Sequence, residues 1–197
     1  MVIVDIISID KKRSKVICDE IIFALYNGEI RKYNLCVGDV IEEHVWKSIL
    51  EDVLYKRAKE KSLYLLETME RTEYQICQKL KEGYYPIDII ERVIAFLKRY
   101  NYINDEVYAK KYIDTYINKK SIKCIEMDLY KKGIKRDIFE SYLVRNEELE
   151  YEQISALLAK RKYNENKNNP KEKNKIISYI IRRGYSYESI SKVISSM

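Results

Sequence analysis

The chain has 197 residues and a formal net charge of +6, from 37 Lys and Arg against 31 Asp and Glu. Five Gly and two Pro leave little room for turn-rich β structure, and a charged fraction of 35% favours a mainly helical protein. No stretch approaches the ~20 apolar residues of a membrane span, and no basic segment precedes an apolar run at the start, as a secretory signal would require. We therefore expect a cytoplasmic protein of one large domain or two small ones, with no membrane partner.

In the first 40 residues, short β-prone runs predict a small antiparallel sheet. The runs lie at 2–4, 6–7, 15–18 and 21–25. Polar residues between them predict turns, and Asn27-Gly28 is a further turn signal. Residues 33–38 are expected to form the turn that leaves the sheet.

From Ile41 the apolar spacing becomes helical, and one long helix is expected to continue through Leu66. Thr72 is a predicted N-cap, with Gln75 as its capping-box partner. Pro86 is expected in the first turn of the next helix, where its missing N–H costs nothing. Further caps are predicted at Asn104 or Asp105, and at Asn169 before Pro170.

A pattern of five apolar residues occurs three times, about fifty residues apart. Counted from the second residue of each copy, the offsets are −4, 0, +10, +13 and +14. Gly133 and Gly184 stand at +4 and are expected to end helices in the left-handed conformation, whereas the first copy has Gly83 one place early. A repeat of this length predicts an array of supersecondary units. The fifteen positions are Ile76, Leu80, Ile90, Val93 and Ile94, then Ile125, Leu129, Phe139, Tyr142 and Leu143, then Ile176, Ile180, Ile190, Val193 and Ile194.

The expected fold is therefore mainly α, a tandem array of three three-helix units preceded by a small N-terminal antiparallel β segment. The polar run at 163–170 is expected to be a flexible loop within the third unit. The predicted segments are 1–40 for the β-rich part, 41–103 for the lead-in helix and first unit, 104–148 for the second unit, and 149–197 for the third.

The cysteines and the single histidine argue against a metal site. No two cysteines form a C-x-x-C pair, and His44 is the only histidine. A zinc site would need thiolates gathered from distant positions, so small buried side chains in a reducing compartment is the favoured interpretation. We expect no metal and no other cofactor. The scattered cysteines are Cys18, Cys36, Cys77 and Cys124.

No nucleophile motif, phosphate loop or metal-ligand spacing is present in the sequence, which predicts a binding protein rather than an enzyme. Tyrosine is in excess at 19 residues, and Tyr108, Tyr112 and Tyr116 lie one helical turn apart beside lysines. Such rings could stack on nucleic-acid bases. A core stripe that keeps its hydroxyls in water is the favoured interpretation.

Charge is unevenly distributed along the chain. Residues 160–183 carry nine Lys or Arg against two acids, a net +7, whereas residues 137–152 carry −5. Such asymmetry suits contact with a polyanion or with a protein of mixed charge. Ordinary solvated helix faces remain the favoured explanation of any single charge run.

A more specific motif lies in the second copy of the repeat. It reads Asn104-Asp105-x-x-Tyr108-Ala109-x-x-Tyr112-Ile113, followed by Ile125-x-x-x-Leu129-x-x-Lys132-Gly133-Ile134. This motif resembles the central motif of the RecX family, the bacterial regulators of the RecA recombinase. Arg71-Thr72-x-x-x-Ile76-x-x-x-Leu80 is similar to the family's preceding unit, and the resemblance covers about residues 55–197. One departure is Lys119-Lys120-Ser121-Ile122, which stands where the family often has a glycine.

The resemblance implies a non-enzymatic regulator that binds the RecA–DNA filament and most often inhibits ATPase activity and strand exchange, in DNA repair, the SOS response and homologous recombination. The expected partners are the RecA-type recombinase filament and the DNA within it, bound by a monomer. Two alternatives stay open: a stand-alone DNA-binding helical protein and a helical adaptor for an unrelated protein. The basic residues expected to contact the filament are Lys131, Lys132, Lys135, Lys160, Arg161, Lys162, Arg182 and Arg183.

Overall fold

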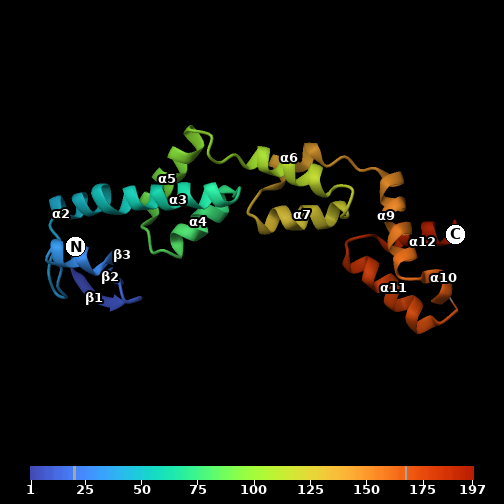
Figure 1. Cartoon of the computed structure of the whole chain (residues 1–197), viewed down its shortest axis with the longest axis horizontal. Helices are drawn as coiled ribbons and strands as arrows, with labels where there is room; N and C mark the ends of the chain where they lie inside the picture. Colours follow the sequence, from blue (N-terminus) through green and yellow to red (C-terminus); the bar gives the residue numbers. More distant parts are fainter. Residues whose placement is uncertain (20, 167) are drawn as a thin grey trace. The chain divides into compact units, whose positions relative to one another are not determined.

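The computed structural model describes residues 1–19, 21–166 and 168–197, which fold into two compact units, Met1–Asn104 and Asp105–Met197 (Figure 1). Both units are mainly helical, and the first also carries a three-stranded antiparallel sheet. The expected fold class is therefore confirmed. Among the described residues, no helix has the length and apolar character needed to cross a bilayer.

The N-terminal sheet has the strand order β1-β2-β3, as consecutive hairpins require. Alternation places Val16, Phe23 and Leu25 on its buried face. The turn between the first two strands is held by Asp10, whose Oδ1 accepts the backbone N–H groups of Lys12 and Arg13. The strands are β1 (Ile3–Ser8), β2 (Arg13–Cys18) and β3 (Ile22–Tyr26).

The predicted turn at Asn27-Gly28 is wrong, because these residues begin helix α1 (Asn27–Lys32). The Glu29 carboxylate accepts the backbone N–H of Tyr26 at 2.7 Å, which satisfies a donor just before the first turn. The exit turn at 33–38 is present, with the left-handed conformation at Asn34 and Gly38.

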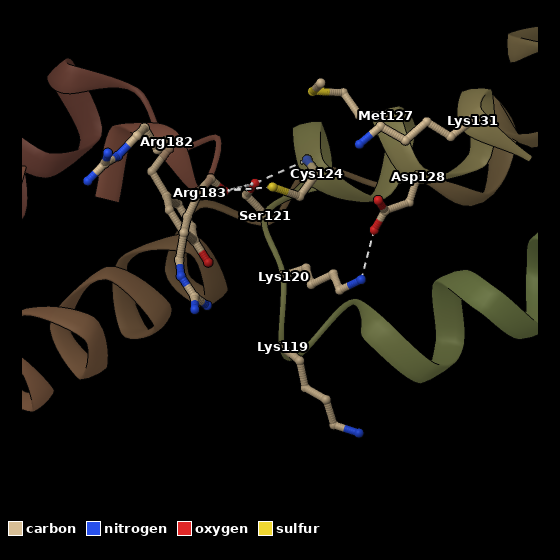
Figure 2. A pocket seen from close by; sticks show the side chains of 10 residues that line it. Lys119, Lys120, Ser121, Cys124, Met127, Asp128, Lys131, Arg182 and Arg183 are labelled. Atoms are coloured by element: carbon tan, nitrogen blue, oxygen red, sulfur yellow. Dashed lines mark hydrogen bonds and ion pairs between the residues drawn. The ribbon is translucent and has the colours of Figure 1, made fainter. Parts of the chain in front are cut away.

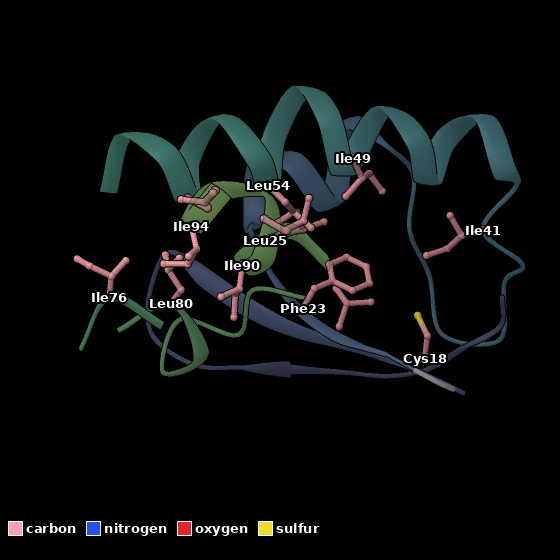
Figure 3. Packing of buried hydrophobic residues seen from close by; sticks show 14 of the residues in the cluster. Cys18, Phe23, Leu25, Ile41, Ile49, Leu54, Ile76, Leu80, Ile90 and Ile94 are labelled. Carbon is pink, nitrogen blue, oxygen red and sulfur yellow. The ribbon is translucent and has the colours of Figure 1, made fainter. Parts of the chain in front are cut away.

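A continuous helical segment then crosses the sheet, and Figure 3 shows Ile49 and Leu54 directed from it toward Phe23 and Leu25. Its middle part is a π-helix, so the predicted long helix exists but is not α-helical throughout. Glu51 in the π-helical part accepts two hydrogen bonds from Arg92, at 2.7 and 2.8 Å, which ties this segment to α5. The parts are α2 (Glu43–Ser48), η1 (Ile49–Tyr55) and α3 (Lys56–Thr68).

The first unit is completed by α4 (Glu73–Lys81) and α5 (Ile87–Arg99). The predicted capping box is confirmed: Thr72 Oγ1 accepts the Gln75 N–H at 3.3 Å, and Gln75 Oε1 accepts the Thr72 N–H at 3.1 Å. Pro86 takes the N-cap position, one residue before the first helical turn in which it was expected. One hydrophobic cluster joins the sheet, the long helical segment and these two helices.

The second unit contains two further hydrophobic clusters, whose buried residues lie within 109–139 and within 154–193. The predicted helix start at Asn169-Pro170 is confirmed, because the Asn169 side chain caps a helix with proline in its first turn. The elements are α6 (Asp105–Tyr116), α7 (Ile122–Lys131), α8 (Arg136–Phe139), η2 (Glu140–Tyr142), α9 (Glu147–Lys160), α10 (Tyr163–Asn166), α11 (Pro170–Arg182) and α12 (Tyr187–Ser195).

The predicted flexible loop at 163–170 is wrong for its first part. Residues 163–166 form the short helix α10, and Tyr163 is buried in the cluster formed with α9 and α11. Tyr163 is the one aromatic residue in this otherwise polar run, and its burial holds α10 against the rest of the unit. Lys167 in the same run lies outside the described residues. The division of the chain at residues 40, 103 and 148 stays a prediction.

The repeat is confirmed as a core pattern, since twelve of its fifteen positions are buried and Tyr142, Leu143 and Ile194 are half-buried. The turn at +4 is left-handed in every copy, with φ of 56° at Tyr84, 80° at Gly133 and 87° at Gly184.

The displaced Gly83 is explained by space rather than by its backbone angles. A Cβ there would lie 2.8 Å from the Tyr85 ring and 2.9 Å from Lys61 Nζ.

The cysteines are only partly as expected. Cys18 is buried, and burial raises the pKa of its thiol. Cys77 and Cys124 are half-buried, but Cys36 is exposed in the turn that leaves the sheet, so the prediction of four buried thiols is wrong. Among the described residues, no cluster of His, Cys, Asp and Glu is placed to hold a metal ion.

Candidate functional site

A cleft of 340 Å³ in the second unit brings together basic side chains from three separate segments (Figure 2). Lys119 and Lys120 come from the loop after α6, Lys131 from the last turn of α7, and Arg182 and Arg183 from the end of α11. Helices concentrate cations at their C-terminal ends because these oppose the partial negative charge of unpaired carbonyls. The positions of Lys131, Arg182 and Arg183 in the rim therefore follow from where α7 and α11 end.

The two sides of the cleft are held together by the Arg183 carbonyl. Ser121 Oγ donates to it at 2.6 Å and Cys124 Sγ at 3.0 Å, as the dashed lines in Figure 2 show. Ser121 also caps α7, because its Oγ accepts the Cys124 N–H at 3.2 Å. Next to this carbonyl, Gly184 lies so close that a Cβ would be 2.5 Å from Ser121 Oγ. The start of α7 is thus fixed to the turn between α11 and α12.

Lys120 is neutralised within the fold. Its ammonium group donates to Asp128 at 2.7 Å and to the Tyr112 hydroxyl at 3.1 Å, and that hydroxyl donates to Asp128 at 2.9 Å. The bond to Asp128 raises the pKa of Lys120, and the same bond lowers the pKa of Asp128. Burial is the main cause that raises the pKa of Tyr112. In the described part of the chain, no carboxylate lies within ion-pairing distance of the Lys119 or Lys131 ammonium groups, nor of the Arg182 and Arg183 guanidinium groups, although the charge of Lys131 helps to lower the pKa of Asp128.

Two guanidinium groups lie over the ring of Tyr179, and one of them belongs to Arg183 of the cleft. Arg161 Cζ is 3.9 Å from the ring centroid and Arg183 Cζ is 5.0 Å from it. A hydrogen bond from Arg161 lowers the pKa of Tyr179. Arg161 follows α9 and Arg183 follows α11, so two residues that α10 and α11 separate in the sequence contact the same ring.

The other predicted contact residues lie elsewhere on the same unit. Lys160 lines a neighbouring cavity of 520 Å³, whose walls share Lys119 with the cleft. Lys132 Nζ lies 5.4 Å from the ring centroids of both Tyr108 and Tyr112.

Lys135 and Lys162, like Lys132 and Arg161, line neither cavity. Lys135 is exposed at the start of α8, where it occupies the N-cap position. Lys162 pairs with Glu165 at 3.5 Å. Of the eight predicted residues, the structure thus gathers Lys131, Arg182, Arg183 and, through Tyr179, Arg161.

The tyrosine stripe is confirmed as part of the core. Tyr108, Tyr112 and Tyr116 are half-buried and pack on the cluster of Ala109, Ile113 and their neighbours. Lysines of the chain itself lie over these rings, with Lys120 Nζ 4.2 Å from the Tyr116 centroid. The ring faces in contact with these lysines are therefore not available to stack on nucleic-acid bases.

Two stretches of the chain match the family patterns described as the first and third three-helix domains of RecX, over residues 58–97 and 147–194. The chain is also 34% identical to the regulatory protein RecX of Clostridioides difficile (strain 630), over 91% of this chain and 86% of that one. The chain belongs to the RecX family. The regulatory protein RecX of Clostridium acetobutylicum is similarly close, 33% identical over 95% of this chain and 92% of the relative.

A crystal structure of a regulatory protein RecX shares the fold, with a TM-score of 0.66 over 99% of this chain and 100% of the other at 23% identity. Lys119 and Lys120 were noted in the sequence only as lysines beside the tyrosine stripe and as a departure from the RecX motif, and the structure shows that both line the cleft. Two adjacent lysines directly before an N-cap serine were the available signal.

Proposed function

We propose that the protein binds the RecA–DNA filament and inhibits recombinase ATPase activity and strand exchange, without catalysing a reaction itself. Membership of the RecX family carries this proposal, because the relatives are regulatory proteins by name. The cleft supports it with a feature that a polyanionic partner requires: four cations, of Lys119, Lys131, Arg182 and Arg183, that lack a carboxylate partner in the described part of the chain. The protein would act in the cytoplasm, as a monomer.

The electrostatic contribution to binding is expected to come mainly from DNA phosphates. Each cation that neutralises a phosphate releases condensed counterions, which makes the affinity fall steeply as salt rises. The two units give the chain more than one place to engage a filament. Several weak contacts along one polymer then add through a high effective concentration.

The direct experiment measures the ATPase rate of RecA filaments on single-stranded DNA as the protein is added. We expect the rate to fall with increasing protein and to level off at saturation. A rate that stays unchanged, or that rises, would contradict the proposed inhibition.

Sequence-selective binding to naked duplex DNA without recombinase would instead favour the stand-alone DNA-binding alternative. A gel shift with duplexes of different sequence, run with the same protein preparation, separates the two functions.

A further inference from the structure

The cleft has an apolar wall that electrostatic attraction alone does not explain. Met127 and Cys124 of α7 and the buried Tyr185 line it below the cationic rim. The Tyr185 hydroxyl donates to Gln153 Oε1 at 2.9 Å, so its only polar atom is already satisfied. Tyr185 is 5% exposed, and this burial raises the pKa of its hydroxyl to about 12.

From this combination we propose that the cleft binds one nucleotide, with the base against Met127 and Cys124 and the phosphates on either side of it against Lys119 and Lys131. The inference rests on the proposed contact between the protein and DNA and names the part of the DNA that enters the cleft. The source is either one unit of a single strand or a free nucleotide, and these share the same chemistry.

The size of the cleft fits a ligand of this class. Its 340 Å³ lies at the small end of the roughly 300–1,000 Å³ of pockets that hold small ligands. That space is too small for a helix of a partner protein. A base offers a flat π-face to the wall, and the Met127 thioether makes favourable contacts with aromatic rings.

The charges of the cleft favour a nucleotide over an acidic protein side chain. Asp128 contributes a negative charge to the lining, but Lys120 pairs with it at 2.7 Å. Lys119 and Lys131, which Figure 2 shows at opposite ends of the cleft, remain to bind the phosphates on either side of the nucleotide. A carboxylate from a partner would engage these lysines but leave the wall of Met127 and Cys124 uncovered.

Cys124 provides a test inside the cleft itself. It is the only cysteine of the second unit, and Cys36 is an exposed cysteine of the first unit that serves as an internal reference. The full-length protein is treated with iodoacetamide, and the alkylation rate of each cysteine is followed by mass spectrometry. A short oligothymidylate at ten times its Kd leaves about one site in eleven free, so Cys124 should react roughly tenfold more slowly while Cys36 is unaffected.

A matched oligonucleotide of abasic units, with the same number of phosphates, isolates the contribution of the base. We expect it to protect Cys124 several-fold less than oligothymidylate at equal concentration. Equal protection by the two, or no protection by either, would overturn the proposal. Protection by thymidine monophosphate would identify a free nucleotide as a ligand, whereas protection by the strand alone would identify single-stranded DNA.

Two variants separate the phosphate from the base. Lys119→Gln with Lys131→Gln should weaken protection by both oligonucleotides. Met127 is 49% exposed, so its replacement by serine should not disturb the fold. Met127→Ser should lower only the extra protection of Cys124 that oligothymidylate gives over the abasic oligonucleotide. A Met127→Ser protein that keeps the full difference would also contradict the base contact.

Recombinase ATPase is measured separately on the same wild-type protein. If both oligonucleotides protect Cys124 equally while the protein still inhibits the ATPase, the nucleotide site is wrong and the proposed function stands. If oligothymidylate alone protects Cys124 but the protein does not affect the ATPase, the nucleotide site stands and the proposed inhibition is wrong.

Discussion

Replacement of Gly184 by alanine tests the contact that fixes the start of α7 to the turn after α11. Gly184 has a φ of 87°, a left-handed conformation that costs a residue with a Cβ about 1–2 kcal/mol. The new Cβ would also lie 2.5 Å from Ser121 Oγ and 3.2 Å from Lys123 Cβ. Ser121 is 6% exposed and cannot move without loss of its hydrogen bonds to the Arg183 carbonyl and from the Cys124 N–H.

A typical hydrogen bond contributes about 1 kcal/mol net, so the expected loss for Gly184→Ala is about 2–4 kcal/mol. In the local opening equilibrium this corresponds to roughly 30- to 700-fold. Amide hydrogen exchange of the segments 122–131 and 187–195 measures it directly, because exchange reports the free energy of local opening.

Two other glycines are matched controls. Gly38 has a φ of 90° but nothing within 4 Å of an added Cβ, so Gly38→Ala isolates the cost of the backbone angle, about 1–2 kcal/mol. Gly28 lies in α1 with open space around it, and Gly28→Ala should stabilise that helix by about 0.5–1 kcal/mol. If Gly184→Ala destabilises its surroundings no more than Gly38→Ala does, the close approach of Gly184 to Ser121 is wrong.

Two further perturbations test local interactions. Thr72→Ala removes the cap of α4 and should lower the free energy of unfolding, measured in urea, by about 1 kcal/mol. Thr72→Ser keeps a capping hydroxyl and should retain most of that stability, so equal losses in the two variants would contradict the capping role. The pKa of Asp128 is lowered in the fold, so its pairing with Lys120 stabilises the fold above about pH 4 and is lost as the pH falls through the folded pKa. Asp128→Asn should therefore flatten the acid side of the stability curve, measured as urea midpoints against pH, and an unchanged acid side would refute this.

Local signals in the sequence predicted much of the fold because they act over a few residues. The apolar repeat predicted the core, and the caps at Thr72 and Asn169 follow from side chains that reach their own backbone. The helix at Asn27 was missed because Glu29 overrides a turn signal. Residues 163–166 were missed because one buried tyrosine outweighs a polar run.

The candidate site was only partly predictable, because tertiary structure assembles it. Lys131 and Arg183 were named from local charge, but their common cleft depends on the contact of Ser121 with a carbonyl 62 residues away. Nothing in the spacing of these residues indicates that contact. The hydrogen bond that neutralises Lys120 with Asp128 depends in the same way on the packing of α6 against α7. The sequence does not indicate which of the two adjacent lysines, Lys119 or Lys120, forms this bond.

The most direct test of the account is the salt dependence of binding to RecA filaments on single-stranded DNA. A variant with Lys119, Lys131, Arg182 and Arg183 all changed to glutamine is compared with one in which four exposed lysines of the first unit, Lys11, Lys12, Lys47 and Lys81, are changed in the same way. Both lose the same charge. Each lost phosphate contact flattens the logarithmic slope by about 0.7, so we predict a change of about 3 for the cleft variant and little change for the control. Equal slopes and affinities in the two variants would contradict the assignment of the cleft as the filament contact.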